Sequence, residues 1–234
     1  MEDITPNLIR KVNKAFNANL KSDKSVRALI NRLKTSNAGY SDAYKYALCI
    51  GNARAKAFKS EISASALPDG KMYFNIGDKL ITETLGSDYE KISSYSAEIQ
   101  SRINKRLKIG LKPIKPKLEQ DKLKGFIDRL DSEDNFDAVS WILDEPVRLF
   151  AMNIVDNAIR KNAEFQSDAG LGVSVIRIPA AGCCKWCDDL AGEYTYPGVP
   201  SEVFTRHDNC RCTIDYNGKR LSGYTWGSSH NFKD

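Results

Sequence analysis

Apolar residues recur at intervals of three and four along the first 165 positions of the chain, which is the period of helices that pack one face on a core. The helices that this pattern predicts cover residues 5–20, 22–33, 41–58, 87–107, 118–130, 136–143 and 147–165. In the fourth of them, Ser87 and Glu90 have the spacing of a capping box, so we expect a helix to begin there. The N-terminal two thirds of the chain should therefore be mostly helical.

A basic segment without helical periodicity separates the fourth and fifth predicted helices. It begins at Lys105 and ends at Lys117, and the ring of Pro113 and of Pro116 prevents regular helical hydrogen bonding. This pattern predicts an extended connector. Its lysines are candidates for contacts with DNA phosphates, although a solvated linker is the simpler interpretation.

The pattern changes after residue 166, where β-branched residues become frequent. The stretches 173–178, 193–196 and 212–216 each predict a short strand. We therefore expect an α+β protein, with a helical domain over residues 1–166 and a small α+β domain, rich in strands, over residues 167–221. The polar residues 222–234 are predicted to form a flexible tail.

Charge narrows the class of partner only slightly. The chain has 35 Lys and Arg against 30 Asp and Glu, a net charge of +5, which permits a nucleic-acid partner without requiring one. The first residues lack a basic start followed by an apolar core, and no apolar run approaches the length that spans a bilayer. We expect neither a secretory signal nor a membrane contact.

Five of the six cysteines fall between residues 183 and 212, and in a reducing compartment such a cluster favours metal over disulfides. Cys184 and Cys187 form a Cys-x-x-Cys loop, and a second short loop contains His207, Cys210 and Cys212. Two such loops can surround a zinc ion tetrahedrally. We expect Cys184, Cys187 and Cys210 to be ligands, with His207 and Cys212 as alternatives for the fourth place.

The stretch between these two loops can form a hairpin. A domain of about fifty residues has little hydrophobic core, so bound Zn²⁺ would supply much of its folding free energy. A site closed by four protein ligands leaves no position for a catalytic water. The sequence therefore predicts a structural zinc in a zinc-stabilised C-terminal domain.

Motifs for catalysis are missing from the sequence. It contains no Gly-x-Ser-x-Gly, Walker, dinucleotide-binding or His-Glu-x-x-His pattern, and its only histidines are His207 and His230. A metal-dependent nuclease could use His207 with Asp208 and Asn209, but these residues lie inside the predicted zinc loop. We therefore expect no enzymatic activity.

Residues 181–192, AGCCKWCDDLAG, and residues 206–212, RHDNCRC, resemble the C-terminal signature of phage minor head proteins, the head-morphogenesis proteins related to the F protein of phage Mu. Members usually carry Pro where this chain has Asp208, a difference that leaves all candidate ligands in place. The resemblance covers about the last fifty residues. The rest of the chain shares a helical character with the family but no specific motif.

The resemblance implies a non-enzymatic component of a virion or prohead, assembled in the bacterial host cytoplasm. Its partners would be the portal and capsid proteins of the phage head. The alternative function is a zinc-stabilised nucleic-acid-binding or nuclease module of prophage origin, which would retain DNA in a salt-sensitive way or cleave it.

Overall fold

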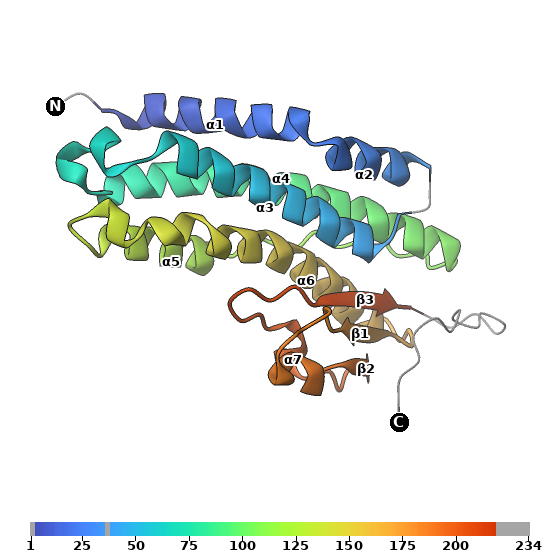
Figure 1. Cartoon of the computed structure of the whole chain (residues 1–234). Coiled ribbons are helices and arrows are strands. Elements are labelled where there is room, and N and C mark those ends of the chain that lie inside the picture. The colour runs from blue at the N-terminus through green and yellow to red at the C-terminus, as the bar shows by residue number, and fades with distance from the viewer. Residues whose placement is uncertain (1–2, 36–37, 219–234) are drawn as a thin grey trace.

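The computed structural model describes residues 3–35 and 38–218, in which long helices lie in layers and a small sheet packs at one edge (Figure 1). The long helices are α1 (Thr5–Ser22), α2 (Lys24–Lys34), α3 (Tyr40–Glu61), α4 (Phe74–Arg106), α5 (Gln120–Asp131) and α6 (Glu145–Asp168). The predicted architecture, a mostly helical N-terminal region followed by a small region rich in strands, is confirmed. No described helix is both long and apolar enough to cross a membrane. The predicted tail, residues 222–234, lies outside the described residues.

Local sequence signals explain where several helices begin. Pro6 occupies the first turn of α1, where a missing N–H costs nothing. The carboxylate of Asp23 accepts a hydrogen bond of 2.8 Å from the backbone N–H of Ser25 and so caps α2. In α3, the side chain of Asp42 accepts from the N–H of Gly39 at 3.1 Å. Each helix then buries one apolar face against its neighbours.

The prediction that the fourth helix begins at Ser87 is wrong. Helix α4 begins 13 residues earlier, at Phe74, and its first turns bury Ile76, Leu80 and Leu85 in the core. Ser87 caps nothing, because its hydroxyl instead accepts a hydrogen bond of 2.6 Å from the ammonium group of Lys91. Burial of this apolar face outweighs the weak helix propensity of the glycines and threonines in residues 74–86.

The structure also bears on the predicted helix at residues 136–143 and on the predicted connector. The segment 136–143, expected to be one helix, forms two short 3₁₀ turns, η3 (Phe136–Ala138) and η4 (Ser140–Leu143). The predicted connector, residues 105–117, is confirmed from Leu107 onward, because residues 107–119 contain neither helix nor strand, whereas Lys105 and Arg106 are the last residues of α4. It is held against α6 by Asn162, whose side chain pairs with both the N–H and the carbonyl of Ile114 at 2.7 and 2.8 Å.

Helices α3 and α6 approach each other closely at Gly51. A Cβ atom placed there would lie 3.0 Å from the Cα of Arg148 and 3.2 Å from the Cβ of Ala151. Both contacts are shorter than ordinary packing distances, and the nearer one is to backbone that cannot rotate away. The absence of a side chain at Gly51 therefore sets the spacing of these two helices.

We expect Gly51→Ala to lower the free energy of unfolding by about 1–3 kcal/mol, because the added methyl must push α3 and α6 apart. Gly86→Ala in α4 is the matched control, since a Cβ there meets nothing within 4 Å. That change should stabilise the protein by up to about 1 kcal/mol through helix propensity alone. Urea denaturation measures both, and a Gly51→Ala protein as stable as the control would contradict the close approach.

The C-terminal sheet has three antiparallel strands in the order β2-β1-β3. They are β1 (Ser174–Ile178), β2 (Gly192–Thr195) and β3 (Thr213–Asn217), close to the three predicted stretches. A five-residue helix, α7 (Lys185–Asp189), follows β1. The hairpin expected between the two metal-binding loops is not formed, because β2, the one strand of residues 188–206, pairs with β1 instead.

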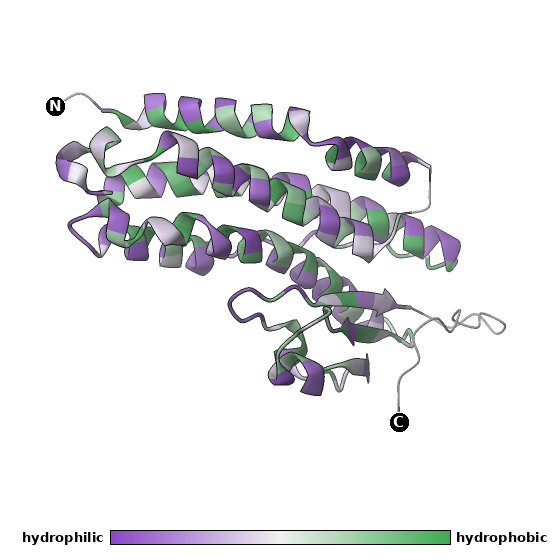
Figure 2. Ribbon diagram, in the orientation of Figure 1, coloured by the Kyte–Doolittle hydropathy of each residue, from purple (hydrophilic) through white to green (hydrophobic). Residues whose placement is uncertain are grey.

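One hydrophobic core runs from the helices into the sheet. Val175, Ile214 and Tyr216 belong to the same cluster of buried side chains as the residues of α3, α4 and α6. Figure 2 shows hydrophobic positions in the strands and in the neighbouring helices where the sheet lies beside them. The predicted boundary at residue 166 falls within α6, near its end. Separate folding of the two parts stays a prediction, and their packing across this boundary is extensive.

Candidate metal centre

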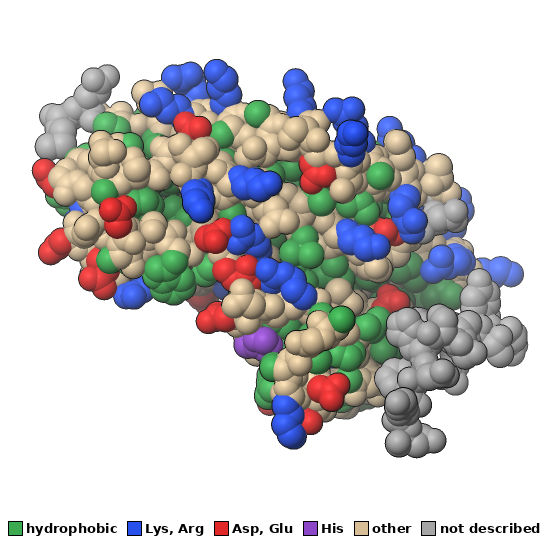
Figure 3. Space-filling model, in the orientation of Figure 1, with side chains coloured by type: hydrophobic (Ala, Val, Ile, Leu, Met, Phe, Trp, Pro, Cys, Tyr) green, Lys and Arg blue, Asp and Glu red, His purple; other side chains and the backbone are tan. Residues whose placement is uncertain are grey.

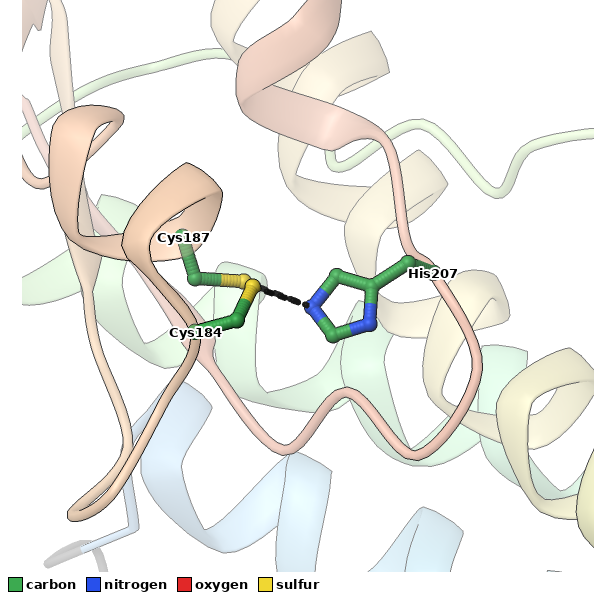
Figure 4. Close-up of side chains that lie close together, drawn as sticks. All are labelled: Cys184, Cys187 and His207. Atoms are coloured by element: carbon green, nitrogen blue, oxygen red, sulfur yellow. Dashed lines mark hydrogen bonds between the residues drawn. The ribbon is translucent and has the colours of Figure 1, made fainter.

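The first chelating loop is built on the start of α7. Cys184 is the N-cap residue and Cys187 lies in the following turn, so that one helical turn brings both thiols to the same side. Cys187 is fully buried, whereas Cys184 is exposed. Figure 4 shows both sulfur atoms directed at the imidazole ring of His207, which comes from a loop facing α7.

The second loop is a tight turn between His207 and Cys210. The N–H of Cys210 donates to the carbonyl of His207 at 3.1 Å. Asn209 closes the turn in the left-handed region, with φ at 60°, a conformation that asparagine tolerates better than most residues. Cys212 follows immediately before β3, and the thiols of Cys210 and Cys212 are both buried.

The potential ligand atoms form two groups of three, each within 4.8 Å of one another, and Cys187 belongs to both. One group contains Cys184, Cys187 and His207, and the other contains Cys187, Cys210 and Cys212. The Sγ of Cys187 lies 3.8 Å from that of Cys210 and 3.0 Å from the Nε2 of His207. Ligands bound at tetrahedral angles to one zinc would be separated by about 3.5–3.8 Å, given Zn–S near 2.3 Å and Zn–N near 2.0 Å.

The imidazole of His207 is in the tautomer that a metal ligand needs. Its Nδ1 lies 2.7 Å from the carbonyl oxygen of Asp208. A carbonyl oxygen can only accept a hydrogen bond, so Nδ1 carries a proton and Nε2 is the ring nitrogen available to a metal ion. Nε2 faces the thiols of Cys184 and Cys187, at 3.3 and 3.0 Å. Such a backbone contact commonly orients a histidine that binds metal.

Arg177 lies behind this cluster in the central strand and is fully buried. Its Nη2 lies 3.7 Å from the sulfur of Cys187 and 3.8 Å from that of Cys210, and its Nη1 donates to the carbonyl of Val203. Within residues 3–35 and 38–218, no carboxylate pairs with it, and its Nε has no hydrogen-bond partner. A buried cation needs a negative charge nearby, and thiolates bound to a metal ion would supply it.

Two further arginines fix the second loop to α6. Arg206 donates to the buried carboxylate of Asp156 through both Nε and Nη2, the latter at 2.7 Å, and to the carbonyl of Cys212 at 2.8 Å. Arg211 makes a two-pronged pair with Glu145 at 2.7 and 2.9 Å. These contacts hold residues 206–212 in place from the side opposite α7.

Burial raises the pKa of the Cys187 thiol well above its ordinary value. Burial also acts to raise the pKa of Cys212, but hydrogen bonds from the N–H of Ala180 and from neighbouring thiols outweigh it and lower that pKa. Burial thus favours the protonated thiol of Cys187, and a bound cation would take the place of that proton. Metal binding provides that exchange.

The structure brings all five predicted ligands together around Cys187. Asp188 and Asp189 of α7 are not part of the cluster, and Asp189 pairs with Lys185 on the solvent side. Cys183 packs beside the cluster and Cys49 lies far from it on α3. The search for metal ligands in the sequence did not single out Arg177. A signal was present, because Arg177 lies two residues after Val175 in the predicted strand and so shares its buried face.

Compared with protein-family models, curated proteins and solved structures, the chain matches none. The nature of the site therefore rests on its own geometry. That geometry is a cluster of cysteines and one histidine able to hold a metal ion, buried on one side and held by three arginines.

Proposed function

We propose that the site binds one structural zinc through Cys184, Cys187, His207 and Cys210. Thiolate and imidazole donors favour zinc over magnesium or calcium, which prefer oxygen. Cys187 is close to both His207 and Cys210, so small side-chain movements would bring these four ligands around one ion. Cys212, whose sulfur accepts a hydrogen bond of 3.4 Å from the N–H of Ala180, is the alternative to His207 for the fourth place.

The role of this metal would be to join parts of the fold. The ligands come from α7 and from the loop before β3, and that loop is tied to α6 through Arg206 and Arg211. An ion at this position would therefore join α7 to the loop before β3, and the two arginine pairs fasten that loop to the helical bundle. Four protein ligands leave no open coordination position, which supports a structural function over catalysis.

We further propose that the chain is a non-enzymatic component of a phage head, in contact with portal and capsid proteins. The support is the residue pattern of the two loops, 181–192 and 206–212, which resembles that of phage minor head proteins. The observation that carries the proposal is that five of the six cysteine and histidine side chains of that pattern, all except Cys183, lie in two groups that share Cys187.

The proposal predicts that the protein is found in assembled phage particles and proheads by mass spectrometry. A phage lacking the gene should form fewer infectious particles, and expression of the wild-type chain should restore them. Deletion of residues 167–234 should abolish this rescue, because the metal-linked part would be lost. A deletion phage that plates normally would contradict the minor head assignment, and metal-dependent DNA cleavage lost in His207→Ala would favour the nuclease alternative.

A further inference from the structure

Helices α1 and α2 carry the excess positive charge of this chain. Residues 5–35 contain eight Lys or Arg and a single acid, Asp23, whereas the rest of the chain has 27 Lys or Arg against 29 Asp or Glu. All eight basic side chains are exposed; they are Arg10, Lys11, Lys14, Lys21, Lys24, Arg27, Arg32 and Lys34. We call this set the α1–α2 basic face.

The charges lie on the side of both helices that points away from the core. In α1, Arg10, Lys14 and Lys21 form one stripe at steps of four and seven, opposite the buried Val12 and Phe16. In α2, Lys24 and Arg27 stand in the same relation to the buried Val26 and Leu29. Figure 3 shows the resulting row of Lys and Arg side chains along the edge that Figure 1 assigns to α1 and α2.

Most of these cations are not neutralised by any carboxylate of the part of the chain that the structure describes. Arg32 pairs with Asp42, with 3.1 Å between nitrogen and oxygen. The five lysines of the face, in contrast, form no ion pair with any carboxylate of residues 3–35 and 38–218. The one acid on the face is occupied, because Asp23 caps α2. Like charges held together in this way repel one another, and an external anion would relieve that repulsion.

We propose that the α1–α2 basic face binds the phosphate backbone of a nucleic acid. At 1.5 Å per residue the two helices extend over about 40 Å, slightly more than one turn of duplex DNA. Besides the cations, the face presents hydrogen-bond donors on the exposed side-chain amides of Asn7, Asn17 and Asn31. Phosphate contacts of this kind need charge and donors but no specific sequence.

Other polyanions fit this surface less well. A membrane-bound helix would direct an apolar face outward, but the apolar faces of α1 and α2 are buried, and Ile30 is their one exposed large apolar side chain. A protein interface would be expected to contain aromatic residues at its centre, and neither helix exposes one. Nucleic acid is therefore the favoured partner.

The basic connector, residues 105–117, is the competing surface. Its Lys115 is already paired with Glu90 of α4, and Glu119 follows directly after the segment. Its chain is also fastened to α6 through Asn162 and Ile114. One lysine of the connector is thus paired with an acid, whereas none of the five lysines of the α1–α2 basic face is paired with a carboxylate of the described residues.

The test measures binding of the full-length protein to a fluorescent 30-base-pair DNA duplex by anisotropy over a range of salt concentrations. Lys11, Lys14, Lys21 and Lys24 are changed together to Gln, which has nearly the same helix propensity as Lys. At about 100 mM salt this should weaken binding at least tenfold and reduce the salt slope by about 3–4, near 0.9 for each lost phosphate contact. Unchanged far-UV circular dichroism verifies folding.

The matched control changes Lys105, Lys108, Lys112 and Lys117 together to Gln, which removes the same charge from the connector. It should bind DNA within about twofold of the wild type, so that a loss specific to the first variant reports position and not net charge. Changing the four α1–α2 lysines to Arg should preserve binding, which keeps the test decisive if the Gln variant folds poorly. The experiment does not depend on the proposed head function.

Several results would overturn the proposal. One is a wild-type protein that does not bind DNA even at about 50 mM salt, where phosphate contacts are strong. Another is a larger loss in the connector variant than in the α1–α2 variant. A third is competition by poly-glutamate equal to that by DNA, which would indicate an acidic protein partner. Binding to vesicles containing phosphatidylserine without binding to DNA would indicate a membrane.

Discussion

Cys187→Ser is expected to abolish metal binding, because Cys187 is the one residue common to both groups of potential ligands and its sulfur lies at their centre. Protein prepared without chelator should contain about one zinc per chain, and the variant close to none, since a serine hydroxyl does not replace a thiolate at neutral pH. Elemental analysis by plasma mass spectrometry measures this directly. Cys49→Ser, at a half-buried thiol of α3 outside the cluster, is the control and should retain the metal.

The same variant tests how the two parts of the fold are connected. Without the metal, residues 173–218 should exchange backbone hydrogens much faster, and the stability of this region should fall by more than about 4 kcal/mol. Helices α1 to α6 should keep their far-UV circular dichroism, because most of the buried side chains lie within them. Loss of all helical signal would show that the helices and the sheet unfold as one cooperative unit.

A comparison of three variants identifies the fourth ligand. If Cys184, Cys187, His207 and Cys210 hold the ion, then His207→Ala should lose zinc and Cys212→Ser should retain it. The reverse result would assign the site to four thiolates and would leave His207 outside it. Cys184→Ser should lose zinc in either case.

Asp156→Asn is expected to destabilise the protein by about 3–5 kcal/mol, the cost of leaving a buried cation without its partner. Asp156 is fully buried on α6, and the side chain of its partner Arg206 is only 4% exposed. Asp156 also accepts a hydrogen bond of 2.6 Å from the hydroxyl of Tyr44, and that hydroxyl in turn accepts from the N–H of Ile214 at 3.3 Å. One carboxylate thus joins α3, α6, β3 and the metal-binding loop.

Thermal and urea denaturation measure this loss of stability. Two further variants test whether the buried charge is its cause. Asp128→Asn removes one partner of an exposed pair on α5, with side chains 68% and 50% exposed, and should change stability by less than about 1 kcal/mol. Asp156→Asn combined with Arg206→Met should be more stable than Asp156→Asn alone, because no buried charge remains. If the double variant were the less stable, charge burial would not be the cause.

The sequence alone determined most of the local structure and the identity of the candidate ligands. Apolar periodicity predicted α1, α2, α3, α5 and α6 and the three strands, because each of these elements buries a regular face. Loops such as Cys-x-x-Cys bring their donors together through local backbone geometry, so the five candidate ligands were recognisable without a fold. A prediction from local sequence was wrong at Ser87. The capping pattern there lies inside α4, which tertiary packing extends to Phe74.

Only the tertiary structure decided what surrounds the metal site and which charges remain free. Asp156 and Arg206 are 50 residues apart, and their pairing depends on the way α6 packs beside the loop before β3. Arg177 contacts the cluster because β1 is the central strand, a matter of strand order. The α1–α2 basic face is likewise defined by which carboxylates the fold brings near each lysine. These relations join residues that are distant in sequence, and a pattern of neighbouring residues carries no information about such contacts.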